Sequence, residues 1–124
     1  MRGSIPILRI GTTLLASVQV ELRDAVAEAF QEDVLAAIEK TGAGGLVIDI
    51  SGLDTVDSYV ARVLADTGRM ARLMGTRSVL VGMQPEVAAT LVRMGYRLEG
   101  VETALNIDEG LALVGATLRL TARS

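Results

Sequence analysis

Residues 46–64 read LVIDISGLDTVDSYVARVL, and this stretch decides the fold. A short apolar run is followed by an acidic turn and then by apolar residues at helical spacing. This is the pattern of a buried strand that leads directly into an amphipathic helix. The junction between strand and helix contains a dense cluster of carboxylates and hydroxyls, namely Asp54, Thr55, Asp57 and Ser58. The stretch therefore predicts a strand–turn–helix unit whose polar groups gather at the start of the helix.

The composition is typical of one globular domain. The chain has 124 residues, of which 50% are hydrophobic and 22% are charged, and this length supports one core rather than two. We expect a single domain over residues 1–124, with its core over about residues 5–116 and a tail over residues 117–124 that frays. No apolar run approaches the roughly 18–20 residues that span a bilayer, and the N-terminus lacks the apolar region of a signal peptide. We therefore expect a cytoplasmic protein without a membrane partner.

The residues that are absent exclude several classes of function. The chain contains no cysteine and no histidine, so it lacks thiolate chemistry, the usual neutral-pH base and the commonest metal ligands. Its formal net charge is −3, and its aromatic residues are two tyrosines and one phenylalanine. A nucleic-acid binder normally has a basic surplus and aromatic side chains that stack on bases. We therefore predict no metal site, no cofactor and no nucleic-acid partner.

The periodicity of apolar residues predicts five short strands and four helices. The first two strands are separated by Gly11-Thr12, which indicates an antiparallel hairpin, and the later strands alternate with helices, which indicates parallel pairing. The fold class is α/β, with a mixed, mostly parallel sheet in the order ββαβαβαβα and helices packed on it. Four methionines at positions 70, 74, 83 and 94 lie on or near helix stripes and are expected in the core. Strands are predicted over residues 5–10, 13–18, 46–50, 78–81 and 98–101, and helices over residues 24–41, 58–74, about 85–95, and from 107 onward with Asn106 as the cap.

The polar cluster has two interpretations when only the residue types are considered. Asp57 or Ser58 would cap the helix, which stabilises it by about 1 kcal/mol over alanine. Alternatively, a hydroxyl at the carboxyl end of a parallel strand lies where open α/β sheets display their sites. A phosphate on Ser58 would be tolerated by the helix amides, and Arg62, one turn further on, could reach it. Asp49, inside the strand, either points to an opening at the sheet edge or bonds to the following turn, and we favour the second.

Enzymatic interpretations find little support. A phospho-accepting receiver domain needs acidic residues at the end of its first strand and a lysine near its last strand, but residues 5–10 have no acid and Lys40 lies in the first long helix. Asp49 and Asp54 could form a hydrolase pair, yet the chain lacks aromatic residues to stack a sugar. The glycines of residues 42–45 follow a helix, whereas a phosphate loop precedes one. We predict that the protein is not an enzyme, with a carboxylate hydrolase as the weakest alternative.

Residues 49–58, DISGLDTVDS, are similar to the signature of STAS domains, the anti-sigma-factor antagonist fold. The expected order of elements agrees with that family over nearly the whole chain. Residues 19–24, 30–64 and 81–95 resemble one branch of the family, the RsbS-type antagonist of the bacterial stressosome. Simple antagonists continue as Asp-Ser-Ser-Gly, whereas here Ser58 is followed by Tyr59, which favours the stressosome branch.

The resemblance implies a non-enzymatic signalling scaffold of the general stress response. In this family the serine that opens the second long helix, here Ser58, is phosphorylated by a GHKL-type serine/threonine kinase of the RsbT type, and Thr55 is the second candidate. The unmodified form would sequester the kinase, and phosphorylation would release it. The expected kinase-binding surface consists of Asp54, Thr55, Asp57, Ser58, Tyr59 and Arg62, and the structural turn beneath it consists of Asp49, Ser51 and Gly52.

The resemblance also implies partners for assembly. RsbR-type STAS paralogues and further copies of the chain are expected in a large assembly, and this chain would be the subunit without a sensor domain. It needs no cofactor of its own, because ATP and Mg²⁺ belong to the kinase. A different function stays open: a ligand-sensing STAS module that binds a nucleotide or an apolar small molecule, since apolar pockets leave no motif in a sequence.

Overall fold

The computed structural model describes residues 5–19, 22–95 and 101–123. The elements follow the predicted order ββαβαβαβα. The strands are β1 (Ile7–Ile10), β2 (Thr13–Ser17), β3 (Gly45–Asp49), β4 (Arg77–Val81) and β5 (Val101–Ala104). The helices are α1 (Asp24–Thr41), α2 (Ser58–Leu73), α3 (Pro85–Arg93) and α4 (Ile107–Arg123).

The five strands form one sheet in the order β1-β2-β3-β4-β5. The pair β1–β2 is antiparallel, and the other three pairs are parallel. The register places Leu15, Val47 and Val79 side by side across the middle of the sheet. The predicted α/β class, the N-terminal hairpin and the mostly parallel sheet are therefore confirmed.

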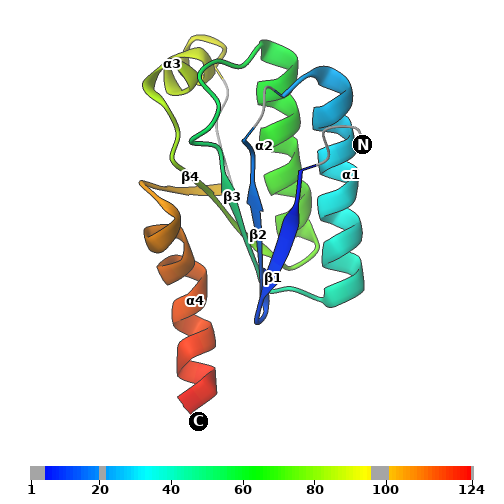
Figure 1. The fold of residues 1–124 in the computed structure, drawn as a ribbon, viewed down its shortest axis with the longest axis vertical. Helices are drawn as coiled ribbons and strands as arrows, with labels where there is room; N and C mark the ends of the chain where they lie inside the picture. Colours follow the sequence, from blue (N-terminus) through cyan, green and yellow to red (C-terminus); the bar gives the residue numbers. More distant parts are fainter. Residues whose placement is uncertain (1–4, 20–21, 96–100, 124) are drawn as a thin grey trace.

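Helices cover both faces of the sheet. Figure 1 shows α1 and α2 side by side on one face and α4 on the opposite face. Alternate residues of a strand point to opposite faces, so each central strand contributes to two cores. The larger core lies between the sheet and the pair α1–α2 and includes Leu14, Leu46, Ile48, Leu80, Val34, Ile38, Val60 and Leu64. The smaller core lies under α4 and consists of Val47, Val79, Val81 and Val114.

The boundaries of the last strand differ most from the sequence-based expectation, and several other element limits shift by one or two residues. The last strand was expected over residues 98–101 but spans Val101–Ala104, and residues 98–100 lie outside the described residues. Pairing with β4 determines this position, because Val101 stands opposite Ser78 and Ala104 opposite Val81. At the C-terminus, α4 continues to Arg123. The expected core limit at residue 116 and the frayed tail stay predictions.

The expectation that the methionines belong to the core is wrong for three of the four. Met70, Met74 and Met94 are exposed, and only Met83 packs partly against the core. For Met70 and Met74, in and at the end of α2, the reason is the close approach of this helix to the sheet: a Cβ atom on Gly68 would lie 2.3 Å from Cγ2 of Val101, whereas Met94 is the C-cap of α3. The face of α2 toward the sheet therefore accepts small residues, and the long methionine side chains project outward.

Candidate functional site

The turn after β3 is built around a buried carboxylate. Asp49 is 7% exposed, and its Oδ1 accepts a hydrogen bond of 3.0 Å from the backbone N–H of Ser51. Gly52 leaves no room for a side chain, because a Cβ there would lie 2.6 Å from the carbonyl oxygen of Val18. The side chain of Gln84, just before α3, donates to the carbonyl oxygen of Ser51 at 2.9 Å. Asp49, Ser51 and Gly52 thus form a compact turn that supports the loop leading to α2.

The start of α2 is capped by Asp57. Its Oδ1 accepts a 2.8 Å hydrogen bond from the backbone N–H of Val60, and its backbone is extended, as in an N-cap residue. Ser58 is the first residue of the helix and is exposed. Within the described residues, the Ser58 hydroxyl has no hydrogen-bond partner. Of the two capping candidates, Asp57 therefore performs the capping, and Ser58 follows it as an exposed residue in the first turn.

The six residues expected to bind a kinase lie together at this helix start. Two buried residues on either side of the segment, Leu53 (2% exposed) and Val60 (1% exposed), anchor it to the core. Arg62 lies one turn beyond Ser58 on the same side of the helix, and its Nε is 3.9 Å from Oδ2 of Asp66. All six residues of the surface predicted to face the kinase (below, the kinase-facing surface) are exposed: Asp54, Thr55, Asp57, Ser58, Tyr59 and Arg62.

A contact that sequence reasoning missed connects this surface to α1. The hydroxyl of Tyr59 donates a hydrogen bond to the carboxylate of Glu28. This bond raises the pKa of Tyr59, the negative charges of Glu28 and Asp24 raise it further, and the positive charge of Arg62 opposes them. The phenol therefore stays protonated and remains a donor at neutral pH. The two residues are 31 positions apart, so no local pattern could have indicated the pair.

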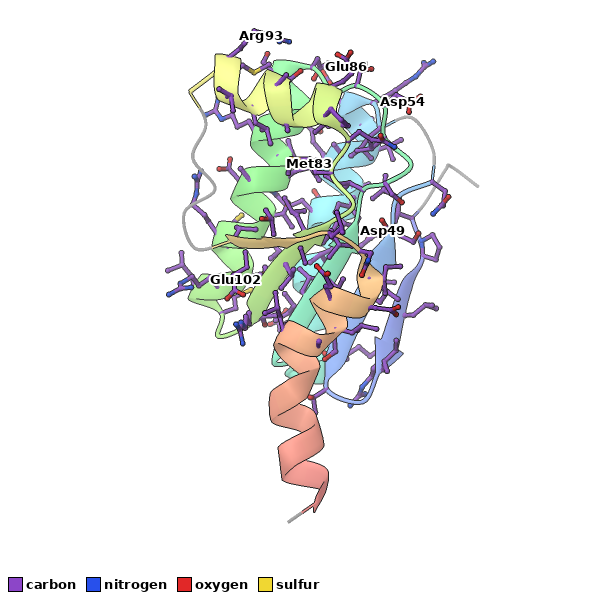
Figure 2. All side chains as sticks on the ribbon, turned by 90° about the vertical axis from the view of Figure 1, so that its left-hand side faces the viewer. Asp49, Asp54, Met83, Glu86, Arg93 and Glu102 are labelled. Carbon is purple, nitrogen blue, oxygen red and sulfur yellow. The ribbon has the colours of Figure 1, made fainter. Side chains whose placement is uncertain are left out.

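Asp49 and Asp54, the two carboxylates of the alternative hydrolase hypothesis, lie in different surroundings. Figure 2 shows Asp49, the last residue of the central strand β3, beside the start of α4, and Asp54 apart from it on the loop toward α2. Asp49 is buried and bonded to its own turn, whereas Asp54 is exposed. The pocket that Asp49 lines does not include Asp54 among its described lining residues, and this arrangement offers no support for paired acid–base chemistry.

Two open pockets that the sequence did not predict lie beside the start of α4. Asp49 and Ser51 line the first, of about 360 Å³, so Asp49 borders an opening as well as bonding to its turn. The second, of about 690 Å³, has Met83 and Glu109 among its lining residues.

The start of α4 is capped by Asn106, as predicted. The side chain of Asn106 accepts a 2.9 Å hydrogen bond from the backbone N–H of Glu109. The side chain of Glu109 accepts a hydrogen bond from the backbone N–H of Leu105, and not from that of Asn106 as a capping box would require.

Two further kinds of site, a metal centre and a membrane-spanning helix, can be compared with the described part of the chain. Over residues 5–19, 22–95 and 101–123, no group of three or more acidic side chains is placed to hold a metal ion. In that same part, no helix has both the length and the apolar character needed to cross a membrane.

Comparison with known proteins identifies the family. The STAS domain family matches residues 4–110. The structure of RsbS S58E from Moorella thermoacetica superposes with a TM-score of 0.81 and 39% identity, covering 93% of this chain and 97% of that one. A chain in a structure of the stressosome, described as a signal integration and transduction hub, superposes with a TM-score of 0.74 and 39% identity over 92% of this chain and 99% of its own.

A sequence relative comes from Bacillus subtilis (strain 168). The RsbT co-antagonist protein RsbRA is 32% identical over 85 residues, which is 68% of this chain and 31% of that protein. The chain thus spans about a third of the length of this curated relative. The fold and these matches define an α/β domain of the STAS class. The chain belongs to the STAS domain family, and within it the chain is similar to RsbS of the stressosome over nearly its whole length.

Proposed function

We propose that the chain is a non-enzymatic stressosome scaffold that sequesters an RsbT-type serine/threonine kinase and releases it when Ser58 is phosphorylated. The observation that supports this most directly is that the helix cap and the exposed serine at the start of α2 are two different residues. Asp57 caps the helix through its bond with the N–H of Val60, so the exposed Ser58 hydroxyl is available for modification. Adding a phosphate there does not remove the cap, and the fold is expected to survive.

The charge change on phosphorylation suits a binding switch. A phosphoserine adds about −1.5 to −2 charges at pH 7. The first-turn amides of α2 favour a negative group, and Arg62 lies on the same side of the helix one turn away. The carboxylates of Asp54 and Asp57 repel the phosphate. Together the three groups make the surface potential at the start of α2 strongly negative. A partner that fits the unmodified surface would then be repelled, which supports release rather than unfolding.

The similarity to stressosome proteins supports the proposed partners. Relatives include an RsbT co-antagonist protein, and a chain of a stressosome structure shares 39% identity with this one. We propose that this chain assembles with RsbR-type STAS paralogues and with further copies of itself. The proposal is that of a cytoplasmic protein with no cofactor, in which ATP and Mg²⁺ serve the kinase.

The decisive experiment measures the intact mass of the protein after incubation with the organism's GHKL-type kinase and Mg-ATP. We expect the wild type and Thr55→Ala to gain one phosphate, and Ser58→Ala to gain none. If Ser58→Ala gains a phosphate and Thr55→Ala does not, Thr55 is the acceptor. If the wild type stays unmodified while the kinase phosphorylates an RsbR-type paralogue, the switch proposal is wrong.

A second measurement tests release. Size-exclusion chromatography of the kinase with the unmodified protein should give a joint peak, and prior phosphorylation at Ser58 should separate the two. The variant Ser58→Ala should keep the kinase bound in the presence of Mg-ATP. A phosphorylated protein that still co-elutes with the kinase would contradict the release step.

The two pockets beside α4 support a second candidate, a ligand-sensing STAS module. They are lined by both polar and apolar side chains, among them Asp49 and Leu105. A ligand that binds the folded protein raises its melting temperature in a saturable way. A thermal shift assay against a panel of nucleotides and lipids would reveal this function. If no compound raises the melting temperature, the ligand-sensing function loses its support and the scaffold is the proposal that stands.

A further inference from the structure

The contact between Tyr59 and Glu28 joins the kinase-facing surface to a helix that the proposed switch does not otherwise involve. Helices α1 and α2 lie side by side in Figure 1. The Tyr59 hydroxyl crosses the space between them to reach the carboxylate of Glu28. Tyr59 is 37% exposed and Glu28 is exposed, so the bond lies at the surface and not in the core.

The bond determines where the tyrosine ring lies relative to Ser58. Consecutive residues of a helix point about 100° apart around its axis, because the helix has 3.6 residues per turn. Ser58 and Tyr59 therefore face different directions from the first turn of α2. With its hydroxyl held by α1, the ring of Tyr59 is directed toward Glu28, and the Ser58 hydroxyl stays uncovered beside it.

We propose that Glu28 is a positioning residue for the kinase-facing surface: by accepting the Tyr59 hydrogen bond, it holds the aromatic ring in one orientation beside Ser58. The inference rests on the proposed function and extends it to α1. Aromatic side chains are frequent anchors in protein interfaces. A ring that is already ordered avoids the entropy loss of being fixed on binding. Glu28 therefore acts on recognition of the protein by the kinase, and not on transfer of the phosphate.

Phosphorylation kinetics at varied protein concentration separate these two effects. Tyr59→Phe and Glu28→Ala should each raise KM by about three- to tenfold, the size expected for ordering one side chain, with kcat within twofold of the wild type. Glu28→Gln keeps a carbonyl acceptor for the hydroxyl and should restore KM to within twofold. The matched control is Glu39→Ala, which removes the same charge from the exposed far end of α1 and should leave KM unchanged.

The double variant Glu28→Ala/Tyr59→Phe provides an internal check. If the two residues act through one bond, the double variant should be no worse than either single variant, whereas independent effects would multiply. Melting temperatures should stay close to that of the wild type, because an exposed bond contributes little to stability. A change in KM without a change in stability therefore identifies positioning.

Each other outcome overturns a defined part of the inference. Unchanged KM in both Tyr59→Phe and Glu28→Ala would show that the ring needs no positioning. An equal defect in Glu28→Gln and Glu28→Ala would show that the charge of Glu28 matters instead of its hydrogen bond. If the wild type takes up no phosphate, the proposed function fails and this inference fails with it. If the wild type is phosphorylated normally and the variants match it, only the role of Glu28 is wrong.

Discussion

The helices α2 and α4 are built alike on opposite faces of the sheet. Each starts near the edge at which the parallel strands end, and each is capped by the residue before it: Asp57 bonds to the N–H of Val60 at 2.8 Å, and Asn106 bonds to the N–H of Glu109 at 2.9 Å. Each also approaches the sheet through a glycine. A Cβ on Gly68 would lie 2.3 Å from Val101, and a Cβ on Gly110 would lie 2.6 Å from Val81.

The two helices differ in the residue that follows the cap. In α4 this residue is Ile107, which packs against the small valine core. In α2 it is Ser58, which is exposed. A cap supplied by the preceding side chain frees the first helical residue for another purpose, and the sequence places a packing group there in one case and a hydroxyl in the other. Helix capping and a modification site are therefore compatible at the same helix start.

The largest change in stability should come from the glycines. Alanine at Gly68 or Gly110 gains up to about 1 kcal/mol of helix propensity but must displace a valine, and overpacking costs about 1–3 kcal/mol. We expect both variants to lose about 1–2 kcal/mol in urea unfolding, with Gly68→Ala the more affected. Gly115 is the matched control, because a Cβ there meets no described atom within 4 Å. Gly115→Ala should be as stable as the wild type or more stable, and a loss there would contradict the packing argument.

The caps should have a smaller and nearly equal effect on stability. Asp57→Ala and Asn106→Ala each remove one bond to a backbone N–H, and each should lose about 1 kcal/mol. Their effects on phosphorylation should differ, because only Asp57 shapes the turn that presents Ser58. We expect slower phosphate transfer in Asp57→Ala and a normal rate in Asn106→Ala. Equal rates in the two variants would remove the functional distinction between the two helix starts.

The smallest expected effect concerns the ion pair at the side of α4. Arg77 donates to Glu102 through Nε at 2.8 Å and Nη2 at 2.9 Å, and through Nη1 to the carbonyl oxygen of Leu113 at 2.8 Å. The hydrogen bonds from Arg77 hold the pKa of Glu102 below its usual value. Because this pKa is lowered on folding, the stabilisation is present above the pKa of the unfolded chain and is lost as the pH falls through the folded value.

Glu102→Gln should remove that part of the acid sensitivity. The pair is exposed to solvent, so the difference between wild type and variant should stay below about 1 kcal/mol at pH 7 and should shrink at high salt. Urea unfolding at pH 7 and at pH 3 measures it. A difference that persists unchanged at pH 3 would show that packing of the side chain, and not its charge, is responsible.

The sequence predicted the limits of a helix or strand well where neighbouring residues determine them. The limits of α1 were predicted as residues 24–41 and are observed there, because a regular apolar stripe ends at Gly42, whose φ is 67°. The position of β5 was predicted poorly, because pairing with β4 determines it. The exposure of Met70 and Met74 depends on how closely α2 approaches the sheet, which no helix stripe reveals.

In the candidate site, too, local features were predictable from the sequence and features that depend on packing were not. The acidic turn and Ser58 were evident from a short stretch, since caps and turns have local residue preferences. The role of Glu28 was not evident from the sequence, because its contact with Tyr59 depends on the packing of α1 against α2. The pockets beside α4 were also missed, since they are bordered by residues from three separate segments of the chain, 49–51, 82–84 and 103–109.

The strand order β1-β2-β3-β4-β5 repeats the order of the strands along the chain. Each strand pairs with the one made just before it, so the sheet can extend by one strand at a time while the polypeptide leaves the ribosome, and the loops to be closed stay short. Within the described residues, α4 is the helix that packs on the face formed by Val47, Val79 and Val81, and it is synthesised after all five strands. We expect this apolar surface to be bare until α4 emerges, so the nascent chain would be most prone to aggregation just before that helix is made.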